Sequence, residues 1–152
     1  MTYHAGDLLL VEGDGGVQDR LIALGTRSRY VHCALIADAA GGILEAVNGG
    51  IRAANASRYA RTRLVDVGLA DEERADMLTW AQTQVGDAYS YLEIASITLA
   101  RITGGHLYLN SGRAFTCSAF CARALEQGGV LLPEACELIS PGDLDRLYPE
   151  AA

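Results

Sequence analysis

Cys117 is the residue whose surroundings in the sequence most favour chemistry. It stands where the irregular segment Phe115-Thr116 runs into CSAFCARALEQ, whose apolar residues recur at three- and four-residue spacing, and Gly128-Gly129 follows. This pattern predicts a helix that begins at Cys117 and ends before the two glycines. A cysteine in the first helical turn lies among unpaired amide groups at the positive end of the helix dipole, and both favour the reactive thiolate.

A cysteine nucleophile needs a base to accept its proton, a group that orients the base, and donors for the oxyanion. The chain offers three histidines as bases. His4 is close to the N-terminus, and His106 follows a pair of glycines, which predicts a loop. His32 lies within the apolar run RYVHCALIA, which predicts a strand, and we therefore take His32 as the candidate base.

The acid that orients His32 is predicted from the register of a hairpin. Alternate residues of a strand share a face, and long side chains can interact diagonally across two strands. If the turn after the strand of His32 leaves out residues 38–41, Glu45 lies diagonally across from His32 on the same face. A five-residue turn would send Glu45 to the other face, and Asn48 would then be the alternative orienter.

The predicted oxyanion donors are less well defined. The backbone N–H of Cys117 is the first candidate, and the hydroxyl of Tyr89 is the second. Ser118, next to the nucleophile, is a further candidate for contacts with the oxyanion or the substrate. The other three cysteines, Cys33, Cys121 and Cys136, are expected to be small buried apolar residues.

The surrounding pattern predicts the elements that must position these groups. Strands are expected at Asp7–Glu12, Arg29–Ala37, Ile43–Val47, Gly50–Ala54 and 62–67. Helices are expected at Val17–Leu24, Glu72–Val85 with Asp71 as its cap, Tyr91–Ile102, from Cys117 onwards, and Pro141–Leu147. Strands followed by helices indicate an α+β domain in which a small antiparallel sheet packs against helices.

Composition limits the classes of function. A chain of 152 residues is long enough for a single domain, which we place at residues 1–152, and its net charge of −7 argues against a nucleic-acid surface. Its apolar runs are shorter than the roughly 20 residues of a membrane span. The N-terminal segment lacks the basic region of a signal peptide, so cytoplasmic synthesis is expected, with non-Sec export, phage delivery or effector delivery left open. The four cysteines form no CxxC pair, so a zinc site is not expected, and a cysteine nucleophile needs no metal or organic cofactor.

Four segments resemble those of the NlpC-like cysteine peptidases. The string FTCSAFCARALEQGGVLLPE resembles their nucleophile segment, and QVGDAYSY resembles a segment that carries a tyrosine, here Tyr89. The string VHCALIADAAGGILEA resembles their histidine hairpin, which places His32 at the base and Glu45 at the orienting group. The string GDLLLVEG resembles their Gly-Asp-Leu strand.

The order of these segments resembles that of the circularly permuted branch. His32 precedes Cys117 by about 85 residues, as in the YiiX/YaeF-like permuted papain-fold proteins and in the lecithin:retinol acyltransferase and PPPDE-type families. The resemblance implies a permuted papain-like fold with a small sheet or half-barrel. Thr116 stands where many unpermuted relatives have Asp, Cys33-Ala34 replaces Val-Gly, and Glu45 replaces a second histidine.

The resemblance implies a cysteine hydrolase that uses a catalytic triad of Cys117, His32 and Glu45 and a thioester intermediate. Its expected substrate is a peptide-type amide, for instance in a peptidoglycan stem peptide or another cell-wall fragment. One alternative is a thioesterase or acyltransferase that acts on lipid or acyl substrates, with the predicted helix Tyr91–Ile102 beside the acyl chain. The other alternative is a catalytically silent binding module, because a fold does not fix a function.

Overall fold

The structure is a computed structural model and describes residues 2–16, 20, 23–24, 26–87 and 116–149. The predicted helix Val17–Leu24 falls mostly outside these residues. The predicted helix Tyr91–Ile102 and the candidate oxyanion donor Tyr89 lie entirely outside them.

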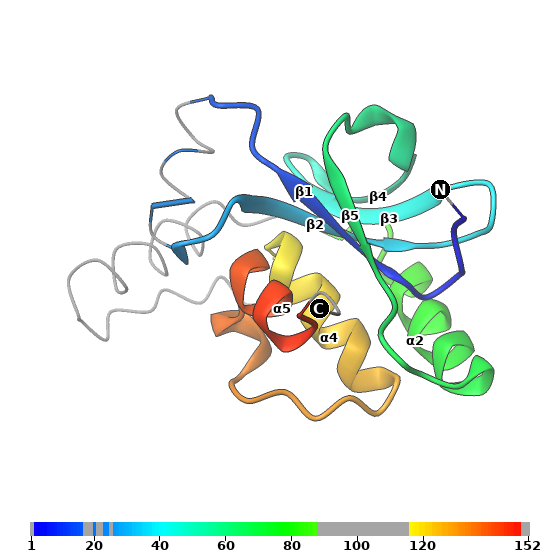
Figure 1. Cartoon of the computed structure of the whole chain (residues 1–152). Helices are drawn as coiled ribbons and strands as arrows, with labels where there is room; N and C mark the ends of the chain where they lie inside the picture. Colours follow the sequence, from blue (N-terminus) through cyan, green and yellow to red (C-terminus); the bar gives the residue numbers. More distant parts are fainter. Residues whose placement is uncertain (1, 17–19, 21–22, 25, 88–115, 150–152) are drawn as a thin grey trace.

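The strands form a five-stranded antiparallel sheet in the order β4-β3-β2-β1-β5 (Figure 1). The strands are β1 (Leu8–Glu12), β2 (Tyr30–Ile36), β3 (Gly42–Val47), β4 (Gly50–Asn55) and β5 (Thr62–Val65). A 3-10 turn, η1 (Ala56–Arg58), follows β4. All five predicted strands are confirmed, with β5 ending two residues earlier than predicted.

The helical elements follow the strands, as an α+β arrangement requires. They are α2 (Asp71–Thr83), α4 (Cys117–Gln127), the 3-10 turn η2 (Cys136–Leu138) and α5 (Pro141–Leu147). The predicted start of α4 at Cys117, its end before Gly128 and both ends of α5 are confirmed.

Two details predicted for α2 are wrong. Asp71 is the first helical residue and not the cap, because the Glu73 carboxylate accepts the Ala70 N–H at 2.8 Å and the helix starts there. The predicted end of the helix at Val85 is two residues too late. The helix ends at Thr83, and Val85 is 47% exposed beyond it.

The sheet separates two apolar layers. Helices α2, α4 and α5 gather on one side of it (Figure 1), where Leu35 of β2 belongs to the same buried cluster as Phe120 and Leu125 of α4. The neighbouring strand residues Ala34 and Ile36 belong to a second cluster. This alternation is what two buried faces of one sheet require.

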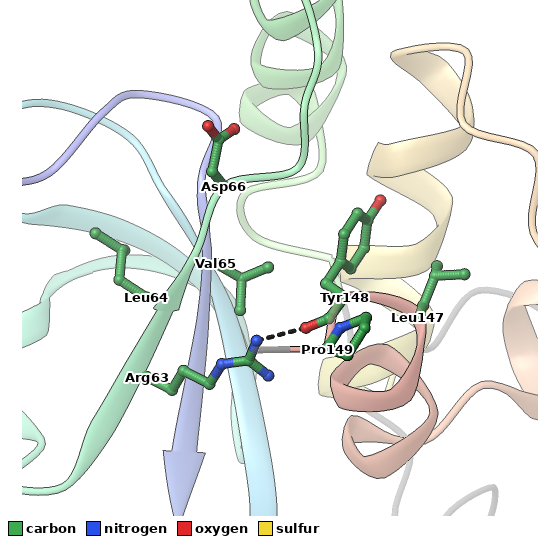
Figure 2. A pocket seen from close by; sticks show the side chains of 7 residues that line it. All are labelled: Arg63, Leu64, Val65, Asp66, Leu147, Tyr148 and Pro149. Carbon is green, nitrogen blue, oxygen red and sulfur yellow. Dashed lines mark hydrogen bonds between the residues drawn. The ribbon is translucent and has the colours of Figure 1, made fainter. Parts of the chain in front are cut away.

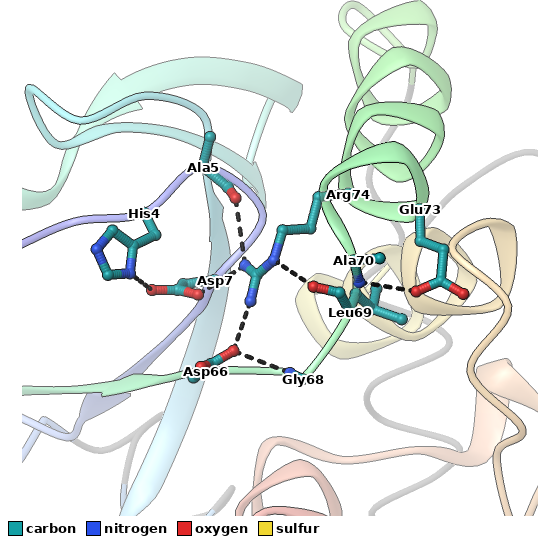
Figure 3. A network of polar contacts seen from close by, with 9 residues as sticks. All are labelled: His4, Ala5, Asp7, Asp66, Gly68, Leu69, Ala70, Glu73 and Arg74. Carbon is teal, nitrogen blue, oxygen red and sulfur yellow. Dashed lines mark hydrogen bonds and ion pairs between the residues drawn. The ribbon is translucent and has the colours of Figure 1, made fainter.

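The Gly-Asp pair before β1 joins the sheet to α2 (Figure 3). The buried Asp7 carboxylate accepts a hydrogen bond from Arg74 of α2 at 2.8 Å, and Arg74 also contacts Asp66 at 2.5 Å and the Leu69 carbonyl at 2.9 Å. Gly6 has φ +88°, and a β-carbon there would lie 2.9 Å from Cγ of Arg74. Glycine is therefore required at this position for both its backbone and its space.

No helix among the described residues has the length and apolar character that crossing a membrane demands.

Candidate active site

The β2–β3 hairpin brings His32 and Glu45 together. Leu35 lies opposite Leu44 and Ile36 opposite Ile43, and the Ala37 N–H donates to the Gly42 carbonyl at 2.7 Å. This is the register of the four-residue turn, so the predicted shared face is confirmed. Nε2 of His32 donates to Oε2 of Glu45 at 3.0 Å.

Asn48, the alternative orienter, has a different position. It lies in the exposed turn that joins β3 to β4. The hairpin has the four-residue turn, and His32 bonds to Glu45. The five-residue turn that would have made Asn48 the orienter does not occur.

Glu45 is a fully buried carboxylate with several donors. Its Oε1 accepts from Nε and Nη2 of Arg52 at 3.0 and 2.9 Å, and its Oε2 accepts from the Tyr59 hydroxyl at 2.5 Å as well as from His32. Nη1 of Arg58 lies 3.9 Å from Oε1. Burial raises the pKa of Glu45, but the hydrogen bonds from His32, Tyr59 and Arg52 and the His32 charge outweigh it and lower the pKa to about 2. Glu45 is therefore a negative charge at neutral pH.

Sequence reasoning missed Arg52 and Tyr59. Arg52 stands directly opposite Glu45 in the β3–β4 ladder, and the Gly49-Gly50 turn was a usable signal for that cross-strand pair. Tyr59 follows η1 and has no spacing that would have singled it out. Its ring centroid lies 5.5 Å from that of His32, so it packs beside the base while it donates to Glu45.

Cys117 is the first residue of α4, as the sequence predicted. The Thr116 hydroxyl accepts the Ala119 N–H at 3.0 Å, which caps the helix and fixes where it begins. The Cys117 N–H is one of the first amides of the helix and has no partner within the helix by geometry. The Ser118 hydroxyl is buried 3.4 Å from that of Thr116.

The Cys117 side chain interacts with the His32 ring. Burial lowers the pKa of His32, but the charge and hydrogen bonding of Cys117 and Glu45 raise it more strongly, to about 9. Since Nε2 is bonded to Glu45, Nδ1 is the ring nitrogen left to accept a proton from the thiol. His32 thus interacts with the ionised Glu45 carboxylate and with the Cys117 thiol, and both raise its pKa.

A second thiol, that of Cys33, also affects the pKa of Cys117. A hydrogen bond with Cys33 and burial raise the pKa of Cys117 well above its usual value, while His32 acts to lower it. His32 and Cys33 are consecutive strand residues and point to opposite faces of β2. Cys117, at the start of α4, acts on the pKa of His32, and Cys33 acts on that of Cys117.

The site is largely buried but not closed to solvent. Cys117 is 6% exposed, and the His32 side chain is 16% exposed. Among the residues that the structure describes, no group of three or more His, Cys, Asp or Glu side chains is arranged to hold a metal ion.

A separate surface pocket of about 660 Å³ lies between β5 and the end of α5 (Figure 2). Arg63 crosses it, donating to the Tyr148 carbonyl and pairing with Asp145. None of the three predicted catalytic residues lines it.

Comparison with known proteins gives a single kind of match. No protein-family model matches the chain, and no curated protein matches it in sequence. Among solved structures, the metalloprotein yiiX from Escherichia coli O157:H7 aligns with a TM-score of 0.63 over 84% of this chain and 67% of its own, at 18% sequence identity. The two chains share a fold.

The similarity to yiiX supports the coarse structural expectation. An α+β domain with a yiiX-like fold agrees with the resemblance of the sequence segments to the YiiX/YaeF-like proteins. At 18% identity the likeness concerns the fold alone.

Proposed function

We propose that the protein is a cysteine hydrolase with a circularly permuted papain-like fold, and that Cys117, His32 and Glu45 are its catalytic residues. One observation carries the proposal. His32 is bonded through Nε2 to a buried, ionised carboxylate and interacts with a thiol at the start of a helix. A nucleophile, a base and an orienting acid in that sequence form a catalytic triad.

The proposed reaction begins with proton transfer. The neutral form of His32 takes the Cys117 proton on Nδ1 as the sulfur attacks a substrate carbonyl, and Glu45 stabilises the imidazolium that forms. The Cys117 N–H at the start of α4 donates to the oxyanion. His32 then gives its proton to the leaving group, and a thioester on Cys117 remains.

Water completes the proposed cycle. His32 accepts a proton from the water as the water oxygen attacks the thioester carbonyl. The carbon–sulfur bond then breaks, His32 returns the proton to the Cys117 sulfur, and a carboxylic acid is released. None of these steps requires a metal or an organic cofactor. Tyr89, the second predicted oxyanion donor, stays a prediction because it lies outside the described residues.

The proposed substrate is a peptide-type amide, such as a bond in a peptidoglycan stem peptide. This choice rests on the resemblance of the Cys117 and His32 segments to the NlpC-like peptidases. Acyl thioesters are the competing substrate class, because the same triad would cleave them.

The test compares variants on both substrate classes. Wild type, Cys117→Ala and His32→Gln would be assayed against stem-peptide amides and against acyl thioesters. We expect wild-type turnover of the amides and a loss of at least about 10³-fold in kcat for Cys117→Ala. Turnover of thioesters alone would move the function to the acyl class, and a Cys117→Ala variant as active as wild type would refute the triad.

A further inference from the structure

Two residues that contact Glu45 have no part in the proposed reaction, and each of them bonds to a different oxygen of the carboxylate. Arg52 donates to Oε1 from Nε at 3.0 Å and from Nη2 at 2.9 Å. The Tyr59 hydroxyl donates to Oε2 at 2.5 Å, and Nε2 of His32 donates to the same oxygen at 3.0 Å. Tyr59 therefore contacts the oxygen that faces the proposed base.

The backbone around Tyr59 is tied to the hairpin that carries His32 and Glu45. Tyr59 follows η1, and its N–H donates to the Ala56 carbonyl at 3.0 Å. The N–H of the buried Ala56 donates in turn, at 2.8 Å, to the carbonyl of Gly41, which lies between β2 and β3. Tyr59 has an ordinary extended backbone, with φ −110° and ψ 121°. Its side chain is thus placed by the hairpin as well as by the bond to Glu45.

The ring of Tyr59 lies beside the imidazole of His32. The two ring centroids are 5.5 Å apart and the ring planes are inclined by 47°, which is the spacing of an aromatic pair. The ring also packs against the second apolar cluster of the sheet, which contains Ala34 and Ile36. A phenylalanine at this position would keep these contacts and lose only the hydrogen bond.

We propose that Tyr59 is a positioning residue of the triad, and that its hydroxyl keeps Oε2 of Glu45 directed at Nε2 of His32. The inference rests on the proposed function, because it gives Tyr59 a role in the same triad. Tyr59 acts through Glu45 and not on the substrate.

The number of hydrogen bonds explains the positioning. An ionised carboxylate has about four lone-pair sites, two on each oxygen. Arg52 supplies two donors to Oε1, and His32 and Tyr59 supply one each to Oε2. A carboxylate bonded in this way cannot rotate without weakening bonds on both oxygens. Without the Tyr59 hydroxyl, Oε2 could turn away from His32 at a smaller cost.

The loss of the hydroxyl would also have an effect of opposite sign. Two donors on one oxygen share its negative charge, so Oε2 without Tyr59 would be a stronger acceptor for His32. Positioning predicts that the bond between Glu45 and His32 weakens in Tyr59→Phe, and charge sharing predicts that it strengthens. Since this bond raises the pKa of His32, the direction in which that pKa moves distinguishes the two.

The test is an NMR titration of the His32 ring protons in the full chain. We expect Tyr59→Phe to lower the pKa of His32 from about 9 by at least about half a unit, because a less well directed Glu45 raises it less. Tyr3→Phe is the matched control, since Tyr3 is another tyrosine packed against the same apolar cluster. It should leave the pKa of His32 unchanged.

A second readout is the rate at which iodoacetamide labels Cys117 at neutral pH. Half a unit in the pKa of the base corresponds to about a threefold change in its proton affinity, so we expect labelling to slow about threefold in Tyr59→Phe. Because the hydroxyl acts through Glu45, adding Tyr59→Phe to Glu45→Gln should slow labelling no further.

The inference is overturned if the pKa of His32 stays constant or rises in Tyr59→Phe, or if Tyr59→Phe slows labelling equally with and without Glu45→Gln. Neither readout depends on turnover. A lowered pKa of His32 in Tyr59→Phe, in a chain without hydrolase activity, would refute only the proposed function. Turnover by the wild type together with an unchanged pKa in Tyr59→Phe would refute only this inference.

Discussion

At the scale of single residues, the charge on Glu45 organises the site. A carboxylate with no exposed surface is costly to bury unless donors replace its water. Arg52, Tyr59 and His32 supply those donors. The carboxylate stays ionised, and its negative charge and hydrogen bond raise the pKa of His32.

We expect Glu45→Gln to lower the pKa of His32 below its value of about 9, because the substitution removes a charge and a hydrogen bond that raise it. The measurement is an NMR titration of the His32 ring protons in both proteins. Asn48→Ala is the matched control and should leave the titration unchanged. An unchanged pKa in Glu45→Gln, or a fall in Asn48→Ala, would contradict the assignment of Glu45 as the orienting acid.

The raised pKa of His32 also predicts a pH-dependent stability. The folded pKa of about 9 lies above the ordinary value of 6.5, so the protonated ring stabilises the fold fully below pH 6.5. That stabilisation is lost as the pH rises through about 9. Its full size is of order 3 kcal/mol.

The expected outcome is that the unfolding free energy of wild type falls relative to that of His32→Gln between pH 6 and pH 9.5. Urea denaturation at both pH values measures it. His4→Gln removes an imidazole at an exposed position and serves as the control. A constant difference between wild type and His32→Gln across this range would contradict the pKa.

At the scale of elements, the start of α4 decides where the proposed nucleophile, Cys117, lies. The sequence was sufficient to predict that start, because the apolar spacing from Cys117 to Leu125 and the Gly128-Gly129 pair define both ends of the helix. The hairpin register could not be decided from the sequence, which allowed a four-residue or a five-residue turn, and the structure has the four-residue turn. The effect of Cys33 on the pKa of Cys117 was not predicted, because strand alternation separates Cys33 from His32.

Thr116→Ala should lower the unfolding free energy by about 1 kcal/mol, because the helix loses the hydroxyl that accepts the Ala119 N–H. Thr116→Ser keeps an acceptor at the same place and is the matched control. Urea denaturation of the three proteins compares them. Equal losses in both variants would show that the hydroxyl does not cap the helix.

The contact between the sheet and α2 depends on Arg74, whose side chain is only 13% exposed against the buried Asp7. We expect Arg74→Ala to lower the unfolding free energy by about 3 kcal/mol, since Asp7 is then left buried without its partner. Arg146→Ala removes an exposed ion pair and should cost less than about 1 kcal/mol. Similar losses in the two variants, measured in urea, would argue against a structural role for the Asp7–Arg74 pair.

At the scale of the whole molecule, the order of the elements makes the site. The proposed base and acid, His32 and Glu45, come from a hairpin in the first third of the chain, and the proposed nucleophile, Cys117, comes from a helix in its last third. A sheet and a set of helices that share a buried core bring them together. The sequence predicted this α+β arrangement from strands followed by helices. It did not predict Arg52 and Tyr59, because their importance depends on contacts with Glu45.

The most direct test of the central claim is the rate at which iodoacetamide labels Cys117, mapped by peptide mass spectrometry at neutral pH. We expect Cys117 to be labelled before Cys33 and Cys121, and we expect His32→Gln to slow its labelling at least about tenfold, since a nucleophilic thiol depends on its base. Equal labelling of Cys33 and Cys117, or a rate that His32→Gln leaves unchanged, would contradict the account.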